Sequence, residues 1–260
     1  SSNRDKLLKL ISDAPKSGKI YKRYHQLLSE VYLINDKKLT KLFIKECWSF
    51  LHLYPNRSQC SAVMMWLAKL EKEASNFHPA VMLYEKLMNL YPASKDYSDA
   101  LYQIARIQQE EFNEYNEATV SFRKFLKMFP EHKYVAWAQY RIATMADKNF
   151  DDWSTAVKEY EVLADKYPNF KHTITSLLRM GAIQDSKLKE RKEAIKTYQR
   201  VFSTYPDSTE ESIEALHRSA NLYVKSKQFE DAVKQHEIVI SKYPKTNGSL
   251  ESLNKCADIY

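Results

Sequence analysis

The sequence predicts an all-helical protein built from repeated helix hairpins. Three observations lead to this prediction: glycine is scarce, aromatic-proline pairs recur at a fixed spacing, and small residues recur in phase with them. The chain has 260 residues and only 3 glycines, whereas glycine makes up about 7% of an average protein. Because tight hairpin turns between strands and phosphate-binding loops depend on glycine, this composition disfavours β-sheets, Rossmann turns and P-loops.

The aromatic-proline pairs mark the end of each repeat. Their spacings are 37, 38, 38, 38 and 38 residues. Proline cannot continue a helix interior, and it disfavours helical geometry in the residue before it. Each pair is therefore expected to end a helix. The six pairs are Tyr54-Pro55, Tyr91-Pro92, Phe129-Pro130, Tyr167-Pro168, Tyr205-Pro206 and Tyr243-Pro244.

Small residues keep the same period and indicate where two helices touch. An alanine precedes each of the last five prolines by 12 residues, and a ring follows that alanine by four; a further small residue, here called the marker, lies one helix earlier. Small side chains let two backbones approach, so each repeat is expected to be a hairpin that stacks on its neighbours. The alanines are Ala80, Ala118, Ala156, Ala194 and Ala232; the markers are Ala68, Ala105, Ala143, Gly181 and Ala220.

The repeat resembles the tetratricopeptide repeat family. The segments "AVMLYEKLMNLYP", "ATVSFRKFLKMFP", "AVKEYEVLADKYP", "AIKTYQRVFSTYP" and "AVKQHEIVISKYP" carry its alanine, ring and proline. The resemblance implies a right-handed superhelical solenoid, here with a 38-residue period where the family usually has 34. The longer "YPxS" connectors look like those of envelope-associated bacterial members such as BamD and CpoB. The first helix of each hairpin is then expected to line the concave face.

The two ends depart from the repeat pattern. Residues 1–55 are interpreted as a basic helical segment with a degenerate repeat, preceded by a short helix from Asn3 to Ser12, because Phe43 stands where other repeats have alanine. Residues 56–244 are expected to form five hairpins. Residues 245–260 match only a first helix, which either caps the array or begins a further repeat. We favour continuation of the natural protein, because capping helices usually carry a more polar outer face.

No motif in the sequence predicts chemistry. The chain has no P-loop, dinucleotide, zinc-protease or nucleophile-elbow motif, and its histidines are dispersed. Asp151 and Asp152 precede a helix pattern, where aspartate commonly caps. The three cysteines have no CxxC spacing, so they are interpreted as small hydrophobic residues and not as a disulfide framework. We expect no catalytic residue, no metal site and no cofactor.

Positive charge is concentrated near the N-terminus. Residues 1–55 hold 11 lysines and arginines against 5 acidic residues, while residues 56–260 hold 29 against 28. The basic segment either faces an acidic surface, such as a membrane or cell wall, or is an ordinary solvated helical face. Nucleic acid is a poor fit, because the repeats are nearly neutral and a binding stripe should follow them.

Candidate partner-binding residues follow from the expected concave face. Residues three before, one after and four after each marker should point inwards. These are Met65, Lys69, Lys72, Tyr102, Arg106, Gln109, Tyr140, Thr144, Asp147, Leu178, Ala182, Asp185, His217, Asn221 and Val224, with Trp137 one turn before Tyr140. Large rings and arginine favour protein anchoring, so the binding residues proposed are Lys69, Tyr102, Arg106, Gln109, Trp137 and Tyr140, although burial between hairpins stays open for the tryptophan and for Tyr140. The carboxylate clamp of chaperone-binding members is disfavoured, since only Asn221 matches one of its positions.

These observations favour a non-catalytic scaffold that binds partner proteins or peptide segments. The connector style points to a bacterial cell-envelope assembly, with a periplasmic, outer-membrane-associated location and a cytoplasmic one as the alternative. The other hypothesis is a docking module of a larger protein whose catalytic or motor domain lies outside this chain.

Overall fold

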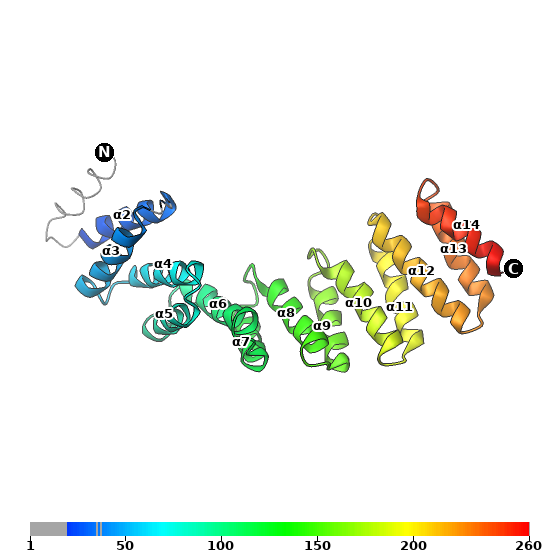
Figure 1. The fold of residues 1–260 in the computed structure, drawn as a ribbon, viewed down its shortest axis with the longest axis horizontal. Helices are drawn as coiled ribbons and strands as arrows, with labels where there is room; N and C mark the ends of the chain where they lie inside the picture. Colours follow the sequence, from blue (N-terminus) through cyan, green and yellow to red (C-terminus); the bar gives the residue numbers. More distant parts are fainter. Residues whose placement is uncertain (1–19, 35, 37, 260) are drawn as a thin grey trace. The chain divides into compact units, whose positions relative to one another are not determined.

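The computed structural model describes residues 20–34, 36 and 38–259, and every regular element among them is an α-helix. Figure 1 labels these helices, α2 to α14. Their bounds are α2 Ile20–Ile34, α3 Thr40–Leu53, α4 Cys60–Glu73, α5 Phe77–Leu90, α6 Asp96–Glu110, α7 Tyr115–Met128, α8 Val135–Lys148, α9 Trp153–Lys166, α10 Thr173–Ser186, α11 Arg191–Thr204, α12 Thr209–Lys225, α13 Phe229–Lys242 and α14 Asn247–Ile259. The predicted helix from Asn3 to Ser12 lies outside the described residues.

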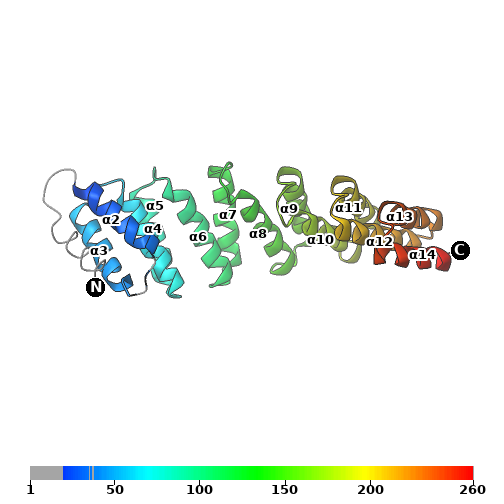
Figure 2. The ribbon, with the colours of Figure 1, turned by 90° about the horizontal axis from the view of Figure 1, so that it is seen from above.

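Consecutive helices pair into the expected hairpins. The five pairs are α4 with α5, α6 with α7, α8 with α9, α10 with α11, and α12 with α13. The chain divides into two compact units, residues 1–132 and 133–260. Within each unit the second helix of one hairpin also packs on the first helix of the next, as the paired helices α11, α12 and α13 illustrate in Figure 2. The all-helical repeat prediction is confirmed.

Each aromatic-proline pair ends a helix, as predicted. The aromatic residue is the C-cap in all six cases, with φ near −130° in Tyr91 and Phe129 alike, and its N–H donates to the carbonyl four residues earlier. The chain then turns, because the N–H three residues after the aromatic donates to the aromatic's carbonyl, as in Phe170 to Tyr167 at 3.0 Å. Proline suits this turn since its fixed φ fits the second turn position.

The tyrosines of these pairs also join successive repeats. The Tyr91 hydroxyl donates to the carbonyl of Pro55 at 2.6 Å, and the same bond recurs from Tyr205 to Pro168 at 2.9 Å and from Tyr243 to Pro206 at 2.7 Å. Phe129 has no hydroxyl and cannot make this bond. The pairs were expected only to end helices, so this bond between repeats is a second role for their tyrosines.

The turn inside each hairpin uses a left-handed residue without using glycine. Positive φ values of 51–61° occur at Ser75, Asn113, Asp151, Lys189 and Lys227, one per hairpin, and at neither of the two glycines that the structure describes. Left-handed geometry costs non-glycine residues roughly 1–2 kcal/mol, less for asparagine and aspartate. These turns are therefore strained in at least the three hairpins that place serine or lysine there.

The markers lie where the two helices of a hairpin touch. All five are buried, and a Cβ added to Gly181 would lie 2.6 Å from the Tyr198 ring of the paired helix. Tyr198 is the ring that follows Ala194 by four residues. The predicted contact of small residue and ring is thus present in this hairpin, and glycine leaves the space that the ring occupies.

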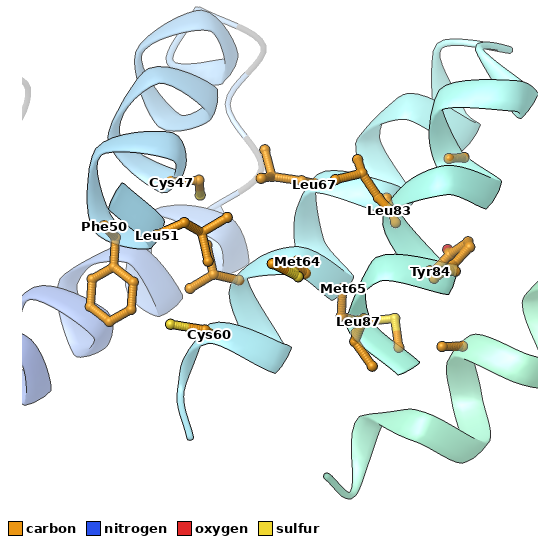
Figure 3. Close-up of a cluster of buried hydrophobic side chains, with 14 of the residues drawn as sticks. Cys47, Phe50, Leu51, Cys60, Met64, Met65, Leu67, Leu83, Tyr84 and Leu87 are labelled. Atoms are coloured by element: carbon orange, nitrogen blue, oxygen red, sulfur yellow. The ribbon is translucent and has the colours of Figure 1, made fainter. Parts of the chain in front are cut away.

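The N-terminal helices share a core with the first full hairpin. Figure 3 shows side chains from α3, α4 and α5 meeting in one cluster, among them Phe50, Met64 and Tyr84. Phe43, at the alanine position, is buried in this cluster and contacts the Tyr32 ring. Cys47 and Cys60 are buried and Cys256 is half-buried, and all three are free thiols. The expectation of unpaired, packed cysteines is confirmed for the first two.

Candidate interaction surface

An exposed stripe runs along the first helix of each repeat. It consists of the residues six and two before the marker and one and five after it, all of which keep accessible surface. We call it the first-helix stripe. In the first unit it contains Ala62, Trp66, Lys69, Glu73, Asp99, Gln103, Arg106 and Glu110; in the second it contains Trp137, Arg141, Thr144, Lys148, Thr175, Arg179, Ala182, Ser186, Glu214, Arg218, Asn221 and Lys225.

Only some of the positions that were expected to point inwards are accessible. The position one after the marker is accessible in all five repeats, but the position three before it is buried at Met65, Tyr102 and Leu178. With about 100° of rotation per residue, positions −3 and +4 lie roughly 40–60° from the buried marker, whereas the stripe lies roughly 100–160° away. The helix surface nearest the marker is covered by packing, so the accessible face is rotated from the one expected.

Tyr102 belongs to the core of the first unit. Its side chain is 4% exposed, and its ring lies 5.7 Å from Phe122 and 5.3 Å from Phe125, centroid to centroid. The prediction that it anchors a partner from an open surface is wrong on this point, because the hairpin's own second helix surrounds the ring.

The other candidates of the first unit remain accessible. Lys69 and Arg106 lie on the first-helix stripe, and Gln109 is half-buried beside it. The Arg106 Nη2 atom lies 2.8 Å from Glu110 Oε2 in an ion pair one helical turn apart. These side chains can meet a partner, and their role in binding stays a prediction.

Helix α2 covers the start of the stripe on α4. Trp66 lies between two rings of α2: the His25 ring stacks on it at 5.1 Å and the Tyr32 ring at 5.4 Å. Burial and the nearby Lys95 charge lower the pKa of His25. A neutral imidazole against an indole keeps this packing apolar, so Trp66 is tied to α2.

A cavity of about 650 Å³ opens beside this contact in the first unit. Its lining includes His25 from α2, Ser61 from α4 and Tyr91 and Asp96 from the following connector and helix. The Ser61 hydroxyl donates to Asp96 Oδ2 at 2.7 Å. This cavity could not be predicted from the sequence, because it depends on how α2 lies across the repeat.

Trp137 and Tyr140 come together in the second unit. Their ring centroids are 6.3 Å apart, and Tyr140 stacks on His172 at 4.7 Å with an interplanar angle of 12°. Phe170 lies 5.1 Å from Trp137, and the Lys171 ammonium lies 4.7 Å from the tryptophan ring. We call these five side chains the aromatic cluster. Both candidates are only partly covered.

The electrostatics of the aromatic cluster favour a neutral histidine. Burial first, and then the Lys171 charge, lower the pKa of His172. The cluster thus presents rings and a single lysine ammonium, which suits contact with apolar and acidic side chains of a partner.

Sequence reasoning missed a row of arginines two residues before the marker. Arg141, Arg179 and Arg218 occupy this position in the three hairpins of the second unit. Arg179 donates from Nε to Asp147 Oδ2 at 2.8 Å and from Nη2 to Oδ1 at 2.6 Å, which joins α10 to α8. Arg218 pairs with Glu214 at 2.6 Å. The signal was their spacing of 38 and 39 residues.

Asp147, expected on the open face, is buried. Besides Arg179 it accepts a hydrogen bond from the Tyr160 hydroxyl at 3.3 Å. Burial and the Asp147 charge raise the pKa of Tyr160. A buried carboxylate is stable only with such partners, so Asp147 joins two hairpins and is not available to a ligand.

Two histidines and a serine hold α14 against the preceding hairpin. His217 Nε2 lies 2.7 Å from Ser252 Oγ, and His236 Nδ1 lies 3.2 Å from the same oxygen. Burial lowers the pKa of both rings, that of His236 to about 4, with the neighbouring His217 and Lys255 charges adding to the shift and Glu251 opposing it. One hydroxyl can serve both rings because it donates to one nitrogen and accepts from the other.

Within the part of the chain that the structure describes, no three histidine, cysteine, aspartate or glutamate side chains are grouped to hold a metal ion. No helix there has both the length and the apolar run that a membrane crossing needs.

Asp152 caps α9, since its carboxylate accepts from the Thr155 N–H at 3.1 Å, as its position before the helix predicted.

Comparison with solved structures agrees with this architecture. A tetratricopeptide protein from Cytophaga hutchinsonii, solved as its C-terminal part, superposes with a TM-score of 0.61 at 15% identity, covering 96% of this chain and 92% of that one. A tetratricopeptide repeat protein from Parabacteroides merdae gives a TM-score of 0.50 at 15% identity, covering 97% and 90%. At this identity the likeness concerns the fold.

Comparison at the level of sequence identifies the repeats themselves. No curated protein sequence matches the chain. The family model described as tetratricopeptide repeat matches residues 62–94, 99–132, 137–169, 175–208 and 214–246. These five segments make up more than half of the chain and coincide with the five hairpins. The chain therefore belongs to the tetratricopeptide repeat family.

Proposed function

We propose that this chain is a non-catalytic scaffold that binds segments of partner proteins along its first-helix stripe. The family assignment supports the proposal that the chain binds other proteins, because tetratricopeptide arrays are protein-interaction modules. The observation that carries the location is the stripe itself: the same four positions stay accessible in every repeat although neighbouring positions are buried.

The residue types on the second unit's stripe support a protein partner. Trp137 and three arginines lie on it, and tryptophan, tyrosine and arginine dominate the energetics of protein interfaces. The aromatic cluster holds Trp137 and Tyr140 in place through ring contacts, so little conformational entropy is lost when they meet a partner. We therefore expect the affinity to concentrate there in the second unit.

A crosslinking experiment tests the location. A photoreactive residue is placed one after the marker at Thr144, Ala182 or Asn221, and for comparison on exposed second-helix positions at Lys158, Lys196 and Lys234. These two sets repeat at nearly the same spacing and differ in the helix that carries them. Partner capture in cells of the source organism should occur from the first set and be absent from the second. Equal capture from both sets would refute the location.

Substitution tests the contribution of the proposed side chains. Tyr140→Ala and Arg106→Ala, alone and together, should weaken capture of the crosslinked partner at low and high salt alike. Lys158→Ala, on an exposed second-helix position outside the stripe, serves as the control. Helicity by circular dichroism should be unchanged in all variants. Undiminished capture by the double variant would exclude both residues.

We further propose that the scaffold serves a bacterial cell-envelope assembly and is periplasmic, in association with the outer membrane. The support is the length and style of the "YPxS" connectors, which make the period 38 residues. Fractionation of the source organism, with the protein detected by antibody, tests this proposal. Recovery in the cytoplasmic fraction alone would overturn it.

The basic N-terminal segment is proposed to add a salt-sensitive contact with an acidic surface. Lys22, Arg23, Lys41 and Lys45 are exposed on α2 and α3. Deleting residues 1–55 would remove Phe50 and other core side chains, so charge reversal is the cleaner test. Lys22→Glu with Arg23→Glu should reduce binding to anionic vesicles at low salt and have little effect at high salt, because exposed charges are screened over about 8–10 Å at physiological ionic strength.

A further inference from the structure

The second helices of the two units differ at two exposed positions. These positions lie two and ten residues after the repeat alanine. In α5 and α7 the side chains there are all apolar and between 47% and 68% exposed: Met82, Leu90, Val120 and Met128. In α9, α11 and α13 the same positions hold Lys158, Lys166, Lys196, Thr204, Lys234 and Lys242, all exposed. Lysine suits a solvated helix face, so the apolar side chains of the first unit indicate a surface that meets something other than water.

Two lysines lie between these apolar side chains. Lys86 and Lys124 are the residues six after Ala80 and Ala118, and both are exposed. At about 100° per residue, the positions two, six and ten after the alanine fall within roughly 80° of helix rotation. They therefore share one side of each helix, and none of them is acidic. We call Met82, Lys86, Leu90, Val120, Lys124 and Met128 the second-helix strip.

A cavity of about 270 Å³ between α3 and α5 adjoins the strip. Trp48, Leu51, Met64 and Leu90 form the apolar part of its lining, and Lys86 also lines it. Trp48 is 45% exposed, and no described residue of the lining carries a carboxylate. An apolar cavity beside an ammonium group matches the two chemical parts of a phospholipid, an acyl chain and a phosphate.

The composition of the strip differs from that of a protein interface. Tryptophan, tyrosine and arginine dominate the energetics of protein interfaces, and lysine is depleted there. The strip contains none of the first three residue types, and lysine stands at its centre in both helices. Apolar side chains next to lysine are instead typical of helices that lie in the surface layer of a membrane, where anionic headgroups attract the lysines.

We propose that the second-helix strip binds the surface of an anionic phospholipid bilayer. The apolar side chains of the strip insert between the acyl chains, and its lysines lie beside the lipid phosphates. Trp48 lies at the boundary between headgroups and acyl chains, where tryptophan is enriched. This membrane contact rests on the acidic-surface contact proposed above for α2 and α3, and it adds an apolar part that salt does not screen.

Vesicle sedimentation tests the proposal. The 260-residue chain is mixed with phosphatidylcholine vesicles that contain about one third phosphatidylglycerol, at low and at high salt. Binding is expected at both, and it should be weaker at high salt, because salt screens the lysines but not the inserted apolar side chains. Vesicles of phosphatidylcholine alone should bind less than the anionic vesicles at low salt.

Substituting the lysines of the second unit into the strip separates insertion from charge attraction. Met82→Lys with Val120→Lys gives α5 and α7 the residue type found at Lys158, and it adds positive charge. Binding at high salt should weaken at least about fivefold, because two inserted side chains are lost. Ser203→Lys with Thr204→Lys adds the same charge to α11 and should not weaken binding. The substituted positions are all exposed, so helicity by circular dichroism should not change.

The fluorescence of Trp48 reports insertion directly. Bromine in the acyl chains quenches a tryptophan only at short range, so brominated vesicles should quench part of the emission of the natural chain. In Trp48→Phe this part of the quenching should be lost. Both proteins are measured at a vesicle concentration that binds them fully, so a difference in affinity does not enter the comparison.

Three results would overturn the proposal. The first is an absence of binding to the anionic vesicles; a protein captured by a photoreactive residue at Met82 would then be the occupant. The second is binding by Met82→Lys with Val120→Lys that equals or exceeds that of the natural chain, which would leave charge attraction alone. The third is quenching in Trp48→Phe that equals that of the natural chain.

The contact proposed for the N-terminal segment is judged separately. If Lys22→Glu with Arg23→Glu binds the anionic vesicles normally while Met82→Lys with Val120→Lys does not, only the N-terminal contact fails. If the first variant loses binding at low salt and the second keeps it at high salt, only the inserted strip fails.

Discussion

Replacing Asp147 by asparagine should destabilise the second unit by a measurable amount. The carboxylate has no exposed surface, and it accepts two hydrogen bonds from Arg179, at 2.6 and 2.8 Å, and one from Tyr160. Asparagine keeps the shape but removes the charge and one acceptor. Breaking a fully buried ion pair costs about 3–5 kcal/mol. The Arg179 side chain is 47% exposed, so water can solvate it again, and we expect a smaller loss of about 2 kcal/mol in the free energy of unfolding.

The assay is thermal unfolding followed by circular dichroism. For a domain of this size, about 2 kcal/mol corresponds to a fall in Tm of roughly 4–8 °C. Asp165→Asn is the matched control, because Asp165 pairs with Arg200 at 2.7 Å between side chains that are 58% and 34% exposed. Exposed pairs contribute at most about 1 kcal/mol. Equal Tm values for the two variants would refute the argument that burial gives the Asp147 pair its importance.

Four further changes test the packing of the repeats. Lys189→Gly should raise stability by about 0.5–1 kcal/mol in urea unfolding, because Lys189 has a φ of 61° and glycine adopts it without strain. Tyr243→Phe should lower stability by about 0.5–1 kcal/mol by removing the bond to Pro206. Ala156→Leu should cost about 1–3 kcal/mol, since Ala156 is fully buried where two helices meet. Stability should fall as the pH drops from about 6.5 towards 4, because folding lowers the pKa of His236 to about 4. In this range the His236 ring binds a proton in the unfolded chain but not in the folded one. Its contribution to stability is therefore complete only above the pKa of histidine in the unfolded chain.

Each of these changes has its own counter-result. The prediction for Lys189→Gly would be contradicted by a lower midpoint of urea unfolding. The prediction for Tyr243→Phe would be contradicted by an unchanged midpoint. An unchanged Tm in Ala156→Leu would show that the hairpin tolerates a larger side chain. His236→Phe should flatten the pH dependence between 6.5 and 4, with His217, Glu251 and Lys255 as the remaining titratable groups around it. An equally steep dependence in that variant would assign the effect to other groups.

The fold was predictable because its signals are local. Proline excludes helix at Pro92 and its counterparts whatever surrounds them, and a small marker is needed wherever two helix axes come close. The hydroxyl bond from Tyr91 to Pro55 was not predictable in this way. It spans 36 residues, and the sequence alone does not tell a hydroxyl that reaches the previous repeat from one that points to water.

The candidate surface was predicted less well than the fold. The repeat period shows which positions lie on the same face of a helix, but it does not show which face is accessible. Lys69 and Arg106 keep accessible surface, because the position after the marker lies well away from the packed side of the helix. Tyr102 was misplaced by a rotation of roughly 40–100°. Rings from the second helix of its hairpin cover that position, and only the packed structure shows how far they reach.

The arginine row shows how the missed phase could have been found. Arg141, Arg179 and Arg218 repeat two positions before the marker, and a charged residue that recurs at one register must lie on an accessible or ion-paired face. Such a residue shows which side of the helix is accessible. A tyrosine at the same period does not, because tyrosine occurs both in the core and at interfaces. In this chain the charged positions define the open face and the aromatic positions define the packed one. Trp66 and Trp137 are exceptions, because their rings lie on the stripe. Trp66 is held by His25 and Tyr32, and Trp137 is held by Phe170 and Tyr140.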